Sequence, residues 1–365
     1  MRAVIHKAEL PAEGRIIAIS DVHANLPYLK GLLAKLSLRS EDTLVFCGDM
    51  LEKGEYSLET LRFIMELSAA RRVLAVQGNC DFWQDSIYRA NERTDAYTKR
   101  YLLSNSAGWG SGLLSQMCGE IGFEFGEDTD MAEFRRAIAD AFRPELDFLD
   151  SLPHVISTEH YVFVHGGIPE GEPESWDGWY CMKNDNFLGQ GRSFKKWIIV
   201  GHWPVMLYGT DTVCANPIIE RERRIISIDG GCVLKDDGQL NALIIPHNGS
   251  EDFSFEYYDR FPVKTVRTAQ KGSDRSAYIR WGDNIVRILE RGEEFSRCVH
   301  VRTGYELDIL TKYLYGESGE VRCNDCTDYV LPLEPGDRVS VVEETSRGFL
   351  VKHNGVSGWY GGELL

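Results

Sequence analysis

The 365-residue sequence lacks any hydrophobic run that approaches the roughly 20 residues needed for a membrane-spanning helix. Its first residues also lack the apolar stretch of a signal peptide. The nine cysteines are odd in number and scattered, which is not the pattern of a secreted disulfide framework. We therefore expect a protein of the reducing cytoplasm that has no membrane association.

Positive charge is scarce, because 40 lysines and arginines stand against 56 aspartates and glutamates, giving a formal net charge of −16. General nucleic-acid binding and binding to anionic membranes both need a basic face, so this charge balance argues against both. The hydrophobic fraction of 43% and the charged fraction of 26% are ordinary for a globular protein. A chain of this length is sufficient for a large core and two domains.

Five short apolar segments each run into polar residues, usually beside a glycine. The segments are rich in β-branched and aromatic residues, which predicts buried strands. Their polar residues would lie at the carboxyl ends of strands, where open α/β sheets place their sites. The apolar segments are residues 16–20, 44–47, 73–77, 161–164 and 197–200. The polar residues that follow them are Asp21, His23, Asp49, Asn79, His165 and His202.

These six residues are a typical ligand set for a metal. Carboxylates, imidazoles and amide oxygens are the donors that hard and borderline divalent metals prefer. Any one of the six taken alone is more simply explained as a turn residue or an ordinary histidine. Six of them in the same strand-end context favour a metal site instead.

The spacing of apolar residues indicates how the chain is organised. Leucines at helical spacing predict helices over residues 26–36 and 58–67, between the first three strands. Strands that alternate with helices predict a mainly parallel sheet with right-handed crossovers. The pattern over residues 84–152 is helical and predicts an insertion that forms one wall of the site.

A change in composition predicts the domain boundary. Residues 265–276 are polar and rich in glycine, serine and lysine, so we predict a linker there. A catalytic domain would then span residues 1–264. The turn-rich, β-like remainder, residues 277–365, would form a second domain.

The sequence resembles the calcineurin-like metallophosphoesterases in the order and separation of five motifs. The motifs are Ser20-Asp21-Val22-His23, Gly48-Asp49, Gly78-Asn79, His165-Gly166-Gly167 and Gly201-His202. Residues 146–168 and 199–232 resemble the phosphoprotein phosphatase branch, whose bacterial members include protein serine/threonine phosphatases and diadenosine tetraphosphate hydrolases. The resemblance covers residues 15–246 and implies an α/β fold, the four-layer αββα sandwich of that family.

The resemblance also implies two divalent metal ions, Mn²⁺ or Fe, with Zn²⁺ as the alternative. One ion would be held by Asp21, His23 and Asp49. The other would be held by Asp49, Asn79, His165 and His202, so that Asp49 bridges the pair. Such a pair polarises the phosphoryl oxygens and yields a bridging hydroxide for in-line attack on phosphorus.

The catalytic residues depart from the phosphatase pattern. Cys80 stands where the family has the histidine that protonates the leaving group, and Asp81 follows it. Glu52 stands where an aspartate orients that histidine, and Lys53 stands where an arginine binds phosphate. These four residues are the predicted catalytic set, and the identity of the general acid stays open.

A second branch of the superfamily shares the Gly-Asn-Cys-Asp sequence. This sequence, residues 78–81, resembles small bacterial phosphodiesterases. Those enzymes carry a second histidine after Gly-His, where this chain has Trp203. The chain therefore combines features of two branches.

We interpret the chain as a dinuclear metal-dependent phosphoester hydrolase of the phosphoprotein phosphatase type. Its substrate would be a phosphorylated small molecule, a nucleotide or a phosphoprotein. The alternatives are a phosphodiesterase or dinucleoside polyphosphate hydrolase of the same superfamily and a non-catalytic scaffold on the same fold. Residues 335–360 resemble a bacterial SH3-like barrel, for which we expect an intramolecular role or a peptide or protein partner.

Overall fold

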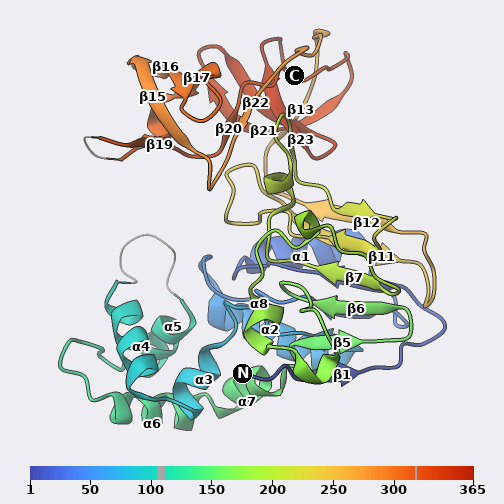
Figure 1. The fold of residues 1–365 in the computed structure, drawn as a ribbon, viewed down its shortest axis with the longest axis vertical. Helices are drawn as coiled ribbons and strands as arrows, with labels where there is room; N and C mark the ends of the chain where they lie inside the picture. Colours follow the sequence, from blue (N-terminus) through green and yellow to red (C-terminus); the bar gives the residue numbers. More distant parts are fainter. Residues whose placement is uncertain (105–111, 317–318) are drawn as a thin grey trace. The chain divides into compact units, whose positions relative to one another are not determined.

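The computed structural model describes residues 1–104, 112–316 and 319–365, which form two compact units (Figure 1). The first unit contains residues 1–204, 217–234 and 238–259, and the second contains 205–216, 235–237 and 260–365. Residues 105–111 of the predicted helical insertion lie outside the described residues. Within the described ranges, no helix combines the length and apolar character that crossing a membrane requires.

Two sheets form the centre of the first unit. The first sheet has the order β12-β11-β2-β3-β4, from Ser254–Tyr258, Leu240–Ile245, Ile16–Ile19, Thr43–Phe46 and Val73–Ala75. The second has the order β1-β5-β6-β7-β10-β9, from Ile5–Lys7, Val155–Ser157, Tyr161–Val164, Trp197–Val200, Ile225–Ser227 and Ile218–Glu220. Strands β2, β3 and β4 are parallel, and so are β6, β7 and β10. The loops that follow these strands therefore leave each sheet at a single edge.

Side chains that alternate along the strands contribute to two different hydrophobic cores. In β2, Ile16 and Ala18 belong to the core that the two sheets share, together with Phe163 of β6. Ile17 and Ile19 of the same strand belong to the core under the helices. Successive side chains of a strand point to opposite faces, so these strands are buried on both sides and are continuously apolar. The predicted α/β fold with stacked sheets is confirmed.

Helices α1 (Leu26–Leu36) and α2 (Ser57–Ala70) pack against the first sheet. Further along the chain follow α3 (Trp83–Tyr88), α4 (Glu92–Ser104), α5 (Leu113–Ile121), α6 (Met131–Ala141) and α7 (Arg143–Ser151). Figure 1 shows α3 to α7 gathered in one helical cluster, which confirms the predicted insertion. Leu114, Phe134 and Leu146 of this cluster share a buried core with Leu29 of α1. The insertion is thus joined to the rest of the first unit through a shared apolar core.

A long segment between β6 and β7 carries the short helix α8 (Gly178–Met182) and the 3₁₀ turns η1 (Pro173–Ser175) and η2 (Leu188–Gln190). The backbone N–H of Gly166, just after β6, donates a 2.7 Å hydrogen bond to the carbonyl of Cys181 in α8. This bond fixes α8 beside the end of β6. The residues that follow α8 are consequently held near the strand ends.

The second unit is all β apart from two 3₁₀ turns, η3 (Val205–Tyr208) and η4 (Thr311–Tyr313), within its described part. One five-stranded sheet joins β13 (Val263–Thr265), β21 (Arg338–Thr345), β22 (Gly348–His353), β23 (Val356–Tyr360) and β8 (Val213–Cys214). The other joins β17 (Glu306–Leu310), β16 (Phe295–His300), β15 (Ile285–Glu290), β19 (Val321–Cys323) and β18 (Leu314–Tyr315). Strands β14 (Tyr278–Ile279) and β20 (Cys326–Thr327) pair separately. An all-β second region was predicted, and its SH3-like character stays a prediction.

The second unit draws in residues from both sides of the predicted linker. Strand β8 precedes the linker by some fifty positions, yet it pairs with β23 through Val213 and Ser357. Within residues 265–276, Val266 bridges Leu364 and Gln270 bridges Leu333. Composition could not reveal these pairings, because strand pairing between distant segments leaves no local signal.

Candidate metal centre

The strand-end loops of the two sheets meet in the first unit. The backbone N–H of His202, after β7, donates a 3.0 Å hydrogen bond to Oδ2 of Asp21, after β2. Nδ1 of His165, after β6, lies 2.9 Å from the carbonyl oxygen of Cys47, after β3. Because a carbonyl oxygen only accepts, Nδ1 carries the proton and the neutral ring has its lone pair on Nε2. His165 is therefore set to offer Nε2 to a ligand.

Asp49 lies at the centre of this meeting point. Its Oδ1 is 3.2 Å from Nε2 of His165, and its Oδ2 is 3.9 Å from Nε2 of His23. Potential ligand atoms of Asp49, His165 and His202 lie within 4.8 Å of one another, and so do those of Asp49, His23 and Cys80. Asp49 belongs to both groups, which is the arrangement expected of a shared ligand.

Several buried polar atoms at this point lack hydrogen-bond partners. Among the described residues they include Asp21 Oδ1, His23 Nδ1 and Asn79 Oδ1. A buried polar atom without a partner costs free energy, and each such atom calls for an explanation. All three belong to predicted ligands, and carboxylate, imidazole and amide donors together suit a divalent cation. The residues present therefore fit the metal pair that the sequence resemblance implies.

The backbone conformation is unusual at the predicted ligands. Asp21, His23, Asp49 and His202 all have positive φ, at 56°, 47°, 49° and 65°. Non-glycine residues rarely adopt this conformation, and strained positions of this kind cluster at functional sites. Gly78 permits the close approach, because a Cβ built there would lie 2.2 Å from the Asp49 nitrogen.

Burial dominates the electrostatics of the site. It raises the pKa of Asp21 well above its usual value, and the charges of Asp229 and Asp49 add to the effect. Burial would also raise the pKa of Asp49, but the adjacent His165 outweighs it and holds that pKa low. Burial lowers the pKa of His23 to about 4. A desolvated cluster of carboxylates is stabilised by added positive charge, which is what a cation provides.

Asp81 holds two loops together. It is completely buried, and its Oδ1 accepts hydrogen bonds from the backbone N–H groups of Met50 and Leu51, at 3.0 and 3.1 Å. Its Oδ2 accepts from Gly78 at 3.0 Å. Burial and the charge of Asp49 raise its pKa to about 7. Both oxygens are occupied by backbone donors, so the contacts are those of a positioning residue.

Glu52 connects the site to the helical insertion. Its Oε1 accepts a 2.8 Å hydrogen bond from the backbone of Leu113, and its Oε2 accepts one from the hydroxyl of Tyr101. Burial raises its pKa. The neighbouring Lys53 has a φ of 71°, and its charge adds to the burial that lowers the pKa of His23. Lys53 is thus a cation close to the predicted ligands.

The Cys80 side chain lies among the predicted ligands. Its Sγ accepts a hydrogen bond from Nδ2 of Asn79 at 3.3 Å, and its backbone N–H donates to Oδ1 of Asp49 at 2.8 Å. Burial raises the pKa of the thiol well above its usual value, and the charge of Asp49 adds to this. The thiol is therefore protonated at neutral pH, although a thiol is a weak hydrogen-bond donor.

Two contributors were not predicted from the sequence. Oδ1 of Asp185 lies 2.8 Å from Nε2 of His202, and the hydroxyl of Tyr101 donates a hydrogen bond to Glu52. Asp185 follows α8 in a long loop rich in glycine and acidic residues, and the length of that loop was its only signal. Tyr101 lies on helix α4, where nothing in the helical pattern distinguishes it.

Aromatic rings surround the loop that carries Cys80. Phe82 meets Trp179 edge-on at 6.5 Å between ring centroids, and Trp83 stacks with Tyr97 at 6.1 Å. The exposed fractions of Trp179 and Tyr97 are 46% and 51%, which is high for such large rings. Burial is the main cause that raises the pKa of Tyr97. Exposed aromatic surface therefore lies beside the predicted ligands.

Comparison with known proteins adds a family match. Residues 14–229 match the family described as calcineurin-like phosphoesterase. The symmetrical bis(5'-nucleosyl)-tetraphosphatase of Pectobacterium carotovorum is 41% identical over 76 residues, which cover 20% of this chain and 26% of that protein. The match thus spans about a quarter of the length of that curated relative.

Solved structures of low sequence identity are also similar to this chain. A metallophosphoesterase from Sphaerobacter thermophilus is 16% identical, with a TM-score of 0.38, and the match covers 68% of this chain and 89% of that one. A protein serine/threonine phosphatase from Saccharomyces cerevisiae is 11% identical, with a TM-score of 0.40, over 72% and 85% of the two chains.

Proposed function

The chain belongs to the calcineurin-like phosphoesterase family, and on that premise we propose that it is a metal-dependent hydrolase of phosphoesters. The observation that carries this proposal is the position of Asp49, which is common to two groups of potential ligands at the meeting point of both sheets. The unpartnered polar atoms of the neighbouring side chains support it. A scaffold without catalytic function would have no need to keep such costly groups buried.

We assign the ligands as the sequence resemblance implies. Asp21, His23 and Asp49 would hold one ion; Asp49, Asn79, His165 and His202 would hold the other. Mn²⁺ or Fe fits a set of oxygen and nitrogen donors, and Zn²⁺ is the alternative. When bound, the pair supplies Lewis acidity that polarises the phosphoryl group and activates water.

The remaining residues position the substrate and the ligands. Lys53 would bind a phosphate oxygen as a point charge rather than in a bidentate fork. Asp81 would hold the loop that carries Asp49 next to the loop that carries Asn79, because it accepts three backbone hydrogen bonds from the two loops. Glu52 would fix the helical insertion as one wall of the site.

This predicted catalytic set lacks a strong proton donor for the leaving group. The Cys80 thiol keeps its proton but donates it poorly, and both oxygens of Asp81 are occupied. Alkoxide leaving groups need a proton, whereas aryl oxides and phosphoanhydride phosphates need it much less. We therefore propose aryl phosphates or phosphoanhydrides as better substrates than phosphoserine peptides.

Dinucleoside polyphosphate hydrolysis is the second candidate. The exposed rings of Trp179 and Tyr97 beside the site favour it, because aromatic faces stack on nucleobases. The relative named as a symmetrical bis(5'-nucleosyl)-tetraphosphatase is consistent with it over the part that matches. A phosphodiesterase remains the other alternative within the family.

A hydrolysis panel tests these proposals. Wild-type protein with added Mn²⁺ is assayed on an aryl monoester, an aryl diester, a diadenosine polyphosphate and a phosphoserine peptide, with Asp49→Asn as the control. We expect hydrolysis of the aryl monoester or the polyphosphate, loss of bound metal in the variant and little cleavage of the peptide. Inactivity on all four substrates, with metal present at two ions per chain, would favour the scaffold.

The oxidation state of the cysteines is relevant to the cellular compartment of the protein. None of the nine, all of which lie in described residues, forms a disulfide. Disulfides are rare in reducing compartments and common outside them. We therefore keep the proposal of a cytoplasmic protein whose catalysis resides in the first unit.

A further inference from the structure

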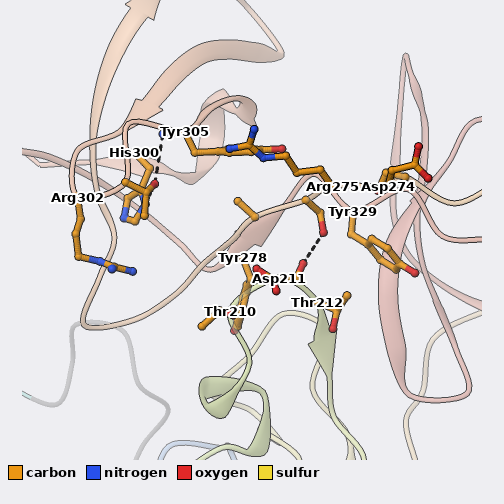
Figure 2. Close-up of a pocket in the computed structure, with 14 residues that line it drawn as sticks. Thr210, Asp211, Thr212, Asp274, Arg275, Tyr278, His300, Arg302, Tyr305 and Tyr329 are labelled. Carbon is orange, nitrogen blue, oxygen red and sulfur yellow. Dashed lines mark hydrogen bonds between the residues drawn. The ribbon is translucent and has the colours of Figure 1, made fainter.

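A cavity of about 540 Å³ lies wholly within the second unit (Figure 2). Three segments that are distant in the sequence line it, residues 210–212, 273–278 and 300–305, together with Tyr329. Its volume falls in the range of roughly 300–1,000 Å³ that is common for small-molecule sites.

The walls of the cavity are tied together by hydrogen bonds. Asp328 accepts from the backbone of Ala277 at 2.8 Å and from the hydroxyl of Tyr305 at 2.7 Å, so one carboxylate joins two walls. The Ser276 hydroxyl donates to the carbonyl of Asp211 at 2.7 Å and joins the third. A site held in this way loses little conformational freedom when it binds a ligand.

Arg275 extends into the cavity from one of these walls. Its guanidinium lies 5.0 Å from the centroid of the Tyr305 ring, a distance typical of a cation–π contact. Figure 2 shows the side chain lying across that ring. In the described part of the chain it forms no ion pair, although acidic residues outnumber basic ones by 16. Its N–H donors are therefore available to a ligand.

Charged side chains lie on both sides of the cavity. Arg302 and Asp274 lie on opposite sides of the view in Figure 2, with Arg275 and Tyr305 between them. Arg302 is already paired with Asp283, and its Nε donates to Oδ2 of that residue at 2.6 Å, so it is Arg275 that would attract an anion. Hydroxyl or amino donors of the same ligand would suit the end with Asp274.

We propose that this cavity binds a phosphorylated small molecule of nucleotide size. Its phosphate would lie on Arg275, because a guanidinium group presents paired donors that match phosphate oxygens. Its hydroxyl or amino groups would face Asp274, and the Tyr329 ring beside Asp274 offers a surface for a flat base. This proposal is independent of the proposed hydrolytic function.

The test uses the full-length chain carrying Asp49→Asn, in EDTA, so that the metal centre neither binds nor hydrolyses the probe. Isothermal titration calorimetry measures binding of AMP and of adenosine, which lacks the phosphate. The same titrations are made with Arg275→Ala, with Arg302→Ala and with the control Arg267→Ala. Arg267 is an exposed arginine of the same unit that pairs with Glu363. Arg275 is also exposed, so its replacement should leave the fold intact.

We expect AMP to bind at least tenfold more tightly than adenosine, since a bidentate charge-assisted contact is worth about a factor of ten or more. Arg275→Ala should remove most of that preference, whereas Arg302→Ala and Arg267→Ala, at arginines already paired with acidic residues, should leave it in place. Equal binding of AMP and adenosine would overturn the proposal. So would an AMP affinity that Arg275→Ala leaves unchanged, or the absence of any saturable binding of AMP.

Discussion

The carboxylate of Asp185 lies 2.8 Å from Nε2 of His202, although the two residues come from different loops of the first unit. The contact leaves Nδ1 of His202 as the ring atom that can serve a metal. A histidine ligand that donates its other N–H to a carboxylate has a fixed tautomer and orientation. Asp185 is thus placed to position a predicted ligand.

Replacing Asp185 with asparagine should weaken metal binding at the site that we propose for His202. Loss of such an outer partner typically costs about 10–100-fold in metal affinity. Competition with a chromophoric chelator measures the affinity of each site, and Glu174→Gln, at an exposed acid of the same loop, is the control. Unchanged affinity at both sites would show that Asp185 does not position His202.

Adding a methyl group at Gly78 should disrupt the centre. A Cβ at this position would lie 2.2 Å from both the backbone nitrogen and Oδ1 of Asp49, so Asp49 would have to move. We expect Gly78→Ala to lose bound metal and activity together. The control is Gly119→Ala in α5, where a Cβ would meet nothing within 4 Å and the helix should gain stability. Full metal content in Gly78→Ala, measured by mass spectrometry, would contradict the assigned role of Asp49.

Restoring the family histidine should change the choice of leaving group. A positioned general acid contributes about 10²–10⁴-fold, mostly for poor leaving groups. Cys80→His should therefore raise kcat/KM for a phosphoserine peptide far more than for an aryl phosphate. Cys80→Ser is the matched control, because serine adds no acid with a pKa near neutrality.

The assay compares both substrates side by side in the three proteins. Adding Glu52→Asp to orient the new ring carries a cost, since Glu52 also holds Tyr101 and Leu113 of the insertion. Wild-type protein that already cleaves the peptide as fast as the aryl ester would mean that another residue supplies the proton.

Stability should fall in mild acid because of His154. Its Nδ1 accepts a 2.9 Å hydrogen bond from the backbone of Val4, and burial lowers its pKa. The unfolded chain, with a histidine pKa of about 6.5, then binds more protons than the folded chain below that pH. The free energy of unfolding should therefore decrease as the pH falls from about 6.5 toward the lower pKa of the folded state.

Urea unfolding at several pH values measures this slope. His154→Gln, which keeps a hydrogen-bond acceptor without the titration, should flatten it. His6→Gln, at an exposed histidine, serves as the control. An identical slope in wild type and His154→Gln would assign the acid sensitivity to other groups.

The sequence by itself determined the fold class and the elements that carry the predicted ligands. Apolar runs of β-branched residues marked β2, β3, β6 and β7 because these strands are buried on both faces. The polar residues after each run could be predicted to lie together, because the carboxyl ends of parallel strands lie at one edge of a sheet. The placement of Asp49 between His23 and His165 agrees with this expectation, and its role as a metal ligand stays a prediction.

Only the tertiary structure decided how distant segments meet. It joined Asp185 to His202, Glu52 to Tyr101, and β8 to β23. Periodicity reports which face of an element is apolar, but it says nothing about which exposed polar group finds which partner. Such pairs depend on loop paths and packing between segments far apart in the chain, and those are fixed only when the whole unit folds.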